Sequence, residues 1–118
     1  MNSFSEIFIQ NVNNVNDSIK KISVKTRTLS SILDEFLPKN IQIDLLSVDT
    51  EGYDLIVLKS NNWNKYIPKV IVTEFEMNSF KEIENNEITK FLNEKGYSIF
   101  SITYLDKNLS NVFFKYNF

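Results

Sequence analysis

The chain has 118 residues, of which 42% are hydrophobic and 14% aromatic, so it is large enough for one packed core and its composition excludes an intrinsically disordered protein. Its formal net charge of −2, from 13 basic and 15 acidic side chains, gives no long-range attraction to polyanions and argues against nucleic-acid or anionic-membrane binding. Because cysteine and histidine are both absent, any chemistry has to use carboxylates, hydroxyls, lysine or tyrosine.

Two short segments near the amino terminus alternate apolar and polar side chains, which is typical of a half-buried strand. They are residues 6–10 and 22–26, and the Asn-rich stretch 11–17 between them indicates a loop. We therefore expect residues 1–27 to contribute extra amino-terminal strands to a single domain that spans residues 1–118.

The next segments alternate between helical and strand patterns. Apolar side chains recur at helical spacing over residues 29–37, with Thr28 as a suitable N-cap and Pro38 as the stop. Residues 41–48 are apolar at nearly every position, which is typical of a strand that is covered on both faces and lies in the middle of a sheet. A short helix is expected over residues 53–59.

The second half of the chain continues the alternation. Residues 70–75 form a β-branched run that predicts another buried strand, and residues 83–95 predict a helix that Gly96 ends. Residues 97–104 and 111–116 predict a terminal antiparallel hairpin. Strands that alternate with helices favour right-handed crossovers, so we expect an α/β fold with a mostly parallel sheet and a C-terminal antiparallel hairpin.

Acidic side chains gather where two of these strands end. Asp49 follows the first buried strand, Glu51 lies in the turn after it, Gly52 allows the backbone to bend, and Glu74 ends the next strand. In open α/β sheets this rim is where ligands bind. Asp49, Glu51 and Glu74 are therefore the candidate catalytic residues, since carboxylates can position a hydroxyl or take its proton, and Asp49 and Glu74 are candidate ligands for Mg²⁺.

A purely structural role for the same residues is also open. Asp49 can hydrogen-bond to turn amides, Glu51 and Asp54 can favour a helix N-terminus through its dipole, and spacing alone does not decide between the two roles. Tyr53 and Trp63 are candidate substrate contacts, because aromatic rings can stack on a sugar or an adenine. Core packing is the favoured alternative for these two aromatic residues.

The order of these motifs resembles a known family. Residues 43–54 read IDLLSVDTEGYD, preceded by Thr28-Leu29 and followed by Val57-Leu58-Lys59 and by a Pro-initiated strand that ends in Glu74. From about residue 24 to its end, the chain resembles the FkbM methyltransferase family. It departs from the family's usual pattern at Ser47, where lysine is common, and at Ser60, where glycine is common.

The resemblance implies a partial Rossmann-like methyltransferase fold, of which the chain would be the carboxyl-terminal portion. It implies transfer of a methyl group from S-adenosylmethionine to a hydroxyl of a sugar or another small metabolite, with Asp49, Glu51, Gly52 and Glu74 at the family's rim motif. The glycine turn and the acidic residue that would hold the cofactor have no counterpart before residue 28. A non-catalytic remnant or interaction module, or a sugar-binding protein that uses the same carboxylates, therefore remains an alternative.

The missing earlier strands would leave an apolar edge at residues 43–49. We expect residues 6–10, residues 22–26, a second copy or a partner chain to cover it. No apolar run approaches about twenty residues, and the amino terminus lacks a basic stretch followed by an apolar one. The expected protein is therefore cytoplasmic and does not enter a membrane, and the family resemblance implies a small-molecule hydroxyl acceptor as its partner.

Overall fold

The computed structural model describes residues 3–10, 19–77 and 79–118, so the predicted loop at 11–17 lies outside the described residues. Within the described part, no helix has the length and apolar character needed to cross a bilayer. The strands are β1 (Ser3–Gln10), β2 (Ile19–Thr26), β3 (Leu45–Val48), β4 (Val70–Phe75), β5 (Tyr97–Asp106) and β6 (Leu109–Tyr116). The helices are α1 (Leu29–Phe36), α2 (Asp54–Lys59), α3 (Phe80–Glu84) and α4 (Glu87–Glu94).

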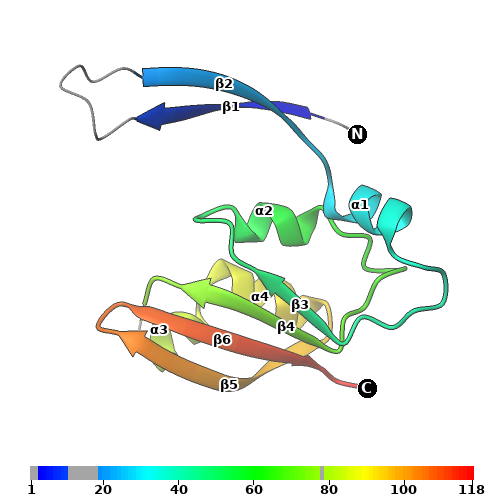
Figure 1. The fold of residues 1–118 in the computed structure, drawn as a ribbon. Coiled ribbons are helices and arrows are strands. Elements are labelled where there is room, and N and C mark those ends of the chain that lie inside the picture. The colour runs from blue at the N-terminus through cyan, green and yellow to red at the C-terminus, as the bar shows by residue number, and fades with distance from the viewer. Residues whose placement is uncertain (1–2, 11–18, 78) are drawn as a thin grey trace.

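The main sheet has four strands in the order β3-β4-β6-β5 (Figure 1). β3 and β4 are parallel, whereas β6 runs antiparallel to both β4 and β5. The α/β class is confirmed, but the sheet is mixed, and the prediction that it is mostly parallel is wrong. The reason is the short turn after Asp106, which brings β6 back between β4 and β5, so that the terminal hairpin supplies two of the three strand pairings.

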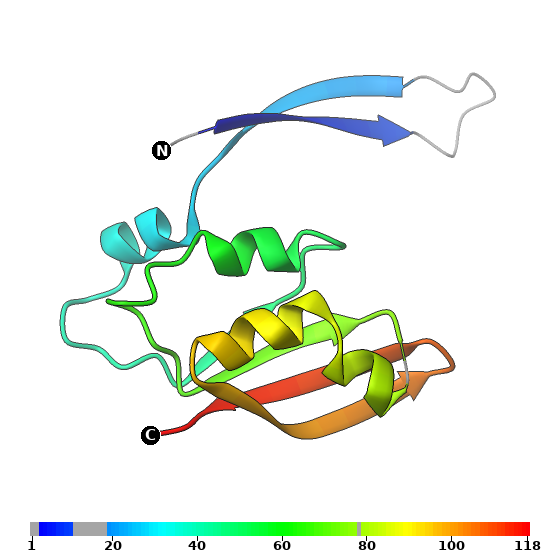
Figure 2. The ribbon, with the colours of Figure 1, turned by 180° about the vertical axis from the view of Figure 1, so that it is seen from behind.

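The helices α3 and α4 lie on one face of this sheet, behind it in Figure 1 and in front of it in Figure 2. The single helix predicted over residues 83–95 is divided, because Asn85 ends α3 and Asn86 caps α4 by accepting a hydrogen bond from the backbone N–H of Ile88 at 2.9 Å. Gly96 follows α4 with a φ of 92°, as predicted for a helix end.

The hydrophobic core lies between the sheet and these helices. Alternate side chains of β4, namely Ile71, Thr73 and Phe75, are buried against the helices, while the intervening ones are half-buried. The core consists of Val48, Leu58, Ile71, Phe75, Ile83, Leu92, Tyr97, Val112 and Phe114. Only one face of the sheet is therefore packed against helices of the described chain.

β3 is not the central strand that its apolar sequence predicts. It has four residues and lies at the edge of the sheet, where Val48 is buried but Leu45 is 55% exposed. The expectation that residues 6–10 or 22–26 cover its edge is also wrong, because β1 and β2 pair with each other along their whole length. A cover supplied by another chain stays a prediction.

The helix α1 begins as predicted. The side chain of Thr28 accepts a hydrogen bond from the backbone N–H of Ser31 at 3.2 Å, and the helix ends at Phe36, two residues before Pro38. None of its side chains is buried, and Phe36 is 69% exposed. The apolar face of α1 is thus only partly covered in the described part of the chain, since Leu29 and Leu33 are half-buried and Phe36 is exposed.

Candidate functional site

A tight turn after β3 positions the first two carboxylates. The backbone N–H of Tyr53 donates to the carbonyl oxygen of Thr50 at 3.4 Å, and the two residues between them, Glu51 and Gly52, have φ values of 50° and 94°. Two successive positive φ angles define a type I′ turn, in which glycine is favoured at the second position. Glu51 adopts a conformation that few non-glycine residues adopt, and the turn carries its side chain toward β4.

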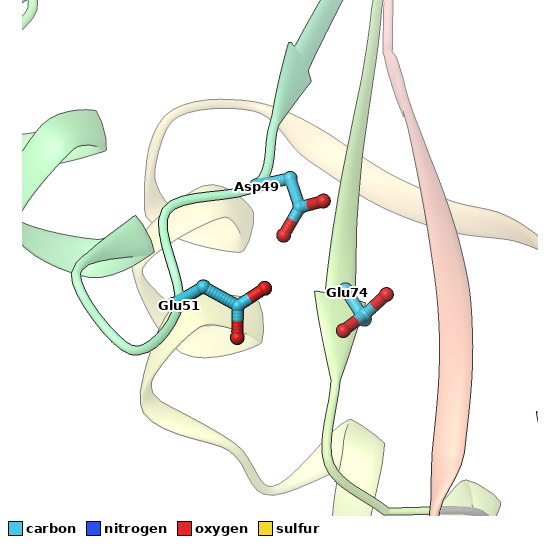
Figure 3. Close-up of side chains that lie close together, drawn as sticks. All are labelled: Asp49, Glu51 and Glu74. Atoms are coloured by element: carbon cyan, nitrogen blue, oxygen red, sulfur yellow. The ribbon is translucent and has the colours of Figure 1, made fainter. Parts of the chain in front are cut away.

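Three carboxylates converge at this rim of the sheet (Figure 3). One oxygen each from Asp49, Glu51 and Glu74 can be chosen so that all three lie within 4.8 Å of one another. Asp49 and Glu51 are exposed, whereas Glu74 is half-buried at the end of β4. The parallel pairing of β3 and β4 places the ends of both strands at the same edge, which is why residues 25 positions apart meet there.

The surroundings of Glu74 raise the proton affinity of its carboxylate. Partial burial raises the pKa of its carboxyl group above the ordinary value, and the negative charges of Asp49 and Glu51 raise it further. The carboxylate of Glu74 therefore accepts a proton more readily than an ordinary glutamate does.

Asp54 connects the two parts of the chain that carry the site. Its buried carboxylate accepts hydrogen bonds from the backbone N–H of Thr50 at 2.8 Å, from the Thr50 hydroxyl at 2.5 Å and from the Thr73 hydroxyl at 2.5 Å. It thereby ties the turn that carries Glu51 to the strand that carries Glu74. Sequence reasoning assigned Asp54 only to a helix dipole; the signal that could have revealed more is the hydroxyl of Thr73, which directly follows the apolar run Val70–Val72 of β4.

The three carboxylates open into a cleft of about 560 Å³ between the rim and the helices. Its walls combine acidic side chains with apolar ones, and none of its lining residues is a lysine or an arginine. The lining residues are Asp49, Glu51, Gly52, Asp54, Leu55, Ile56, Glu74, Phe75, Glu76, Met77, Asn86, Glu87 and Ile88. Asp49 and Glu74 also line a second hollow of about 310 Å³, which Ser47, Val72, Asn111 and Phe113 share.

The two candidate aromatic contacts do not line the cleft. Tyr53 is 64% exposed and points into neither hollow. The ring of Trp63 packs edge-on against Phe91 and Tyr97, with ring centroids 6.0 and 5.7 Å apart, and its indole N–H donates to the carbonyl oxygen of Leu58 at 2.9 Å. For Trp63 the geometry matches the alternative of core packing.

Ser60, one of the two departures from the family pattern, has a structural role here. Its hydroxyl donates to the carbonyl oxygen of Val57 at 2.6 Å and accepts a hydrogen bond from the backbone N–H of Leu29 at 2.9 Å. It therefore joins the end of α2 to the start of α1. Ser47, the other departure, lies on β3 and lines the second hollow.

The chain matches a known protein family. A family model described as the methyltransferase FkbM domain matches residues 2–99, which is most of the chain. Comparison with curated proteins and comparison with solved structures each give no match.

Proposed function

Since the chain belongs to the FkbM methyltransferase family, we propose that it is the carboxyl-terminal, acceptor-binding portion of an S-adenosylmethionine-dependent O-methyltransferase. The proposed acceptor is a hydroxyl of a sugar or of another small metabolite. The observation that carries this proposal is the convergence of Asp49, Glu51 and Glu74 at the mouth of a cleft.

The roles of the three residues follow from their charge and position. Asp49 and Glu51 are exposed acceptors of hydrogen bonds, so they are suited to orient neighbouring hydroxyls of a polyol. Glu74 takes the proton of the reacting hydroxyl, whose O–H bond breaks as the oxygen gains nucleophilic character. Asp54 is a positioning residue, because its buried carboxylate already accepts hydrogen bonds that hold the turn and β4 in a fixed relation.

The cleft fits the acceptor better than it fits the whole cofactor. Its negative charge suits hydroxyl groups and a sulfonium cation, but no cationic side chain among its lining residues can pair with the carboxylate of S-adenosylmethionine. Gly52, the one glycine that lines the cleft, is already used in the turn that carries Glu51. We therefore expect cofactor binding to need protein segments in addition to the described ones.

A divalent cation is a second expected ligand of the rim. Three carboxylate oxygens at this spacing form a hard oxygen set of the kind that Mg²⁺ prefers, and an ion would offset their mutual repulsion. Mg²⁺ would supply charge neutralisation there. The acceptor proposal does not depend on it, so Mg²⁺ enters the experiment as a separate condition.

The test is an NMR titration of the isotope-labelled chain with a panel of monosaccharides, with and without Mg²⁺. We expect amide shifts confined to the turn 49–53 and the end of β4, and we expect Glu74→Gln to weaken binding while Glu84→Gln, an exposed change on α3, leaves it intact. Absence of shifts at the rim for every sugar tested would refute the acceptor site.

Calorimetry with S-adenosylmethionine then distinguishes an autonomous enzyme from an acceptor-binding portion of one. Binding by the chain alone supports an autonomous enzyme, which the lack of cationic cleft residues argues against. Sugar binding without cofactor binding supports an acceptor portion that needs a complementary segment. Failure of both leaves the non-catalytic interaction module as the function.

A further inference from the structure

No helix of the described chain covers the face of the sheet opposite α3 and α4 (Figures 1 and 2), and this face carries an apolar stripe. The stripe runs across three strands, from Val72 on β4 through Phe113 on β6 to Phe100 on β5, while Leu45 on β3 lies two residues along the strands, opposite Val70. Leu45 and Phe100 are 55% and 54% exposed, and the rings of Phe100 and Phe113 pack edge-on with centroids 6.2 Å apart. An exposed contiguous stripe of this kind marks an interaction surface.

The two ends of the same face carry opposite charge. At one end Glu74 on β4 is opposite Asn111 on β6, and Asp49 lines the same hollow. At the other end the exposed Lys115 on β6 is opposite Val70 on β4. Along the strands, the face therefore changes from acidic through apolar to basic.

We propose that this face binds the same face of a second copy of the chain. A twofold axis that lies between the two sheets, perpendicular to the strands, reverses the strand direction of the second copy. The acidic end of each copy, at Glu74, then lies over the basic end of the other, at Lys115, while the apolar stripes pack against each other. The surface is self-complementary in both charge and hydrophobicity, which is what a symmetric interface requires.

The interface and the proposed acceptor site would share Glu74, which lines both hollows. The cleft between the rim and the helices stays open, because α2, β4 and α4 form its walls on the other side of the sheet. The second hollow, which includes Ser47, Val72 and Phe113, would be closed by the second copy. A face only four strands wide is small for a protein interface, so we expect a dimer that dissociates on dilution.

Sedimentation velocity over a concentration series tests the proposal. We expect the wild type to shift from monomer to dimer as concentration rises, and Phe100→Lys and Lys115→Glu each to weaken association by about tenfold or more. Both positions are solvent-exposed, so neither change should prevent folding. Lys90→Glu, the same charge change on the exposed side of α4, is the matched control and should dimerise like the wild type.

A charge-swapped variant identifies the contact itself. Glu74→Lys combined with Lys115→Glu exchanges the two ends of the face, so it should restore the association that Lys115→Glu alone loses. A chain that stays monomeric at every concentration would overturn the proposal. A dimer that is indifferent to both Phe100→Lys and Lys115→Glu would overturn it as well, and would point instead to the free edge of β3 or to the β1–β2 hairpin.

Discussion

At the scale of single residues, Glu74 links the geometry of the rim to pH. Burial and the charges of Asp49 and Glu51 raise its pKa, so in the window between its ordinary pKa and the raised value the folded chain binds more protons than the unfolded chain. The contribution of Glu74 to the free energy of unfolding is therefore present below this window and is lost as pH rises through it.

Urea unfolding at a series of pH values checks this expectation. Glu74→Gln cannot lose a proton, so it should be more stable than the wild type above the window and should show a flatter dependence of stability on pH. Glu84→Gln, which changes an exposed glutamate on α3, should keep the wild-type dependence. Identical pH dependence of the wild type and Glu74→Gln would show that the charges around Glu74 are not coupled to folding.

Gly52 allows a second prediction at the same scale. A Cβ atom at Gly52 would meet nothing within 4 Å, so the cost of Gly52→Ala comes only from its φ of 94° and should be about 1–2 kcal/mol. Gly96→Ala should cost more, because its Cβ would lie 3.1 Å from the ring of Tyr116 in addition to having a positive φ. Chemical denaturation measures both. Equal costs for the two variants would mean that the Tyr116 ring moves aside freely.

The residues of the rim were only partly predictable from the sequence. The meeting of Asp49 and Glu74 was predicted, because both lie at the carboxyl ends of strands that share one edge of a parallel pair. The network of Asp54 was not, because it depends on which face of β4 the Thr73 hydroxyl takes and on how far α2 lies from that strand. Trp63 shows the same limit, since an aromatic residue near a motif can equally pack in the core.

At the scale of elements, the hydrogen bond between Thr73 and Asp54 fixes β4 to the start of α2. Thr73→Val keeps the shape of the side chain but leaves a buried carboxylate with one donor fewer, so we expect a loss of about 1.5–3 kcal/mol in the free energy of unfolding. Thr103→Val, an exposed position on β5, is the matched control and should change stability by less than about 0.5 kcal/mol.

The same substitution bears on the proposed function. If Asp54 positions the rim, Thr73→Val should also weaken sugar binding in the NMR titration, although Thr73 is buried beneath the site. Loss of stability with unchanged sugar affinity would assign the network to folding alone.

The elements that the sequence predicts well are those with a local signal. β4 has the predicted bounds, and α1 begins at the Thr28 cap, because periodicity and capping are properties of a few consecutive residues. The predicted central position of β3 was wrong. An apolar run indicates a strand that can be covered on both faces, but it does not show whether the chain supplies that cover. The break between α3 and α4 arises from Asn85 and Asn86, which the helical pattern around them obscures.

At the scale of the whole molecule, the chain is less compact than its length predicts. Its radius of gyration is 16.9 Å, whereas about 13–14 Å is usual for a domain of this size. The excess arises from the β1–β2 hairpin, which extends away from the main sheet in both views. Ile22 and Val24 on β2 are 42% and 40% exposed, so these apolar side chains of β2 have little packing.

Hydrogen exchange followed residue by residue tests how stability is distributed between these two parts. A two-stranded hairpin without a covered face is marginally stable in water, so we expect the amides of β2 to exchange orders of magnitude faster than those of Ile71, Val112 and Phe114 in the main sheet. These core amides should exchange only through global unfolding, and their protection should fall in Thr73→Val by the amount that denaturation measures. If the amides of β2 were instead as protected as those of β6, another molecule or another segment would have to cover the hairpin in solution, and repeating the measurement at higher dilution would separate the two, because only cover by a second molecule is lost on dilution.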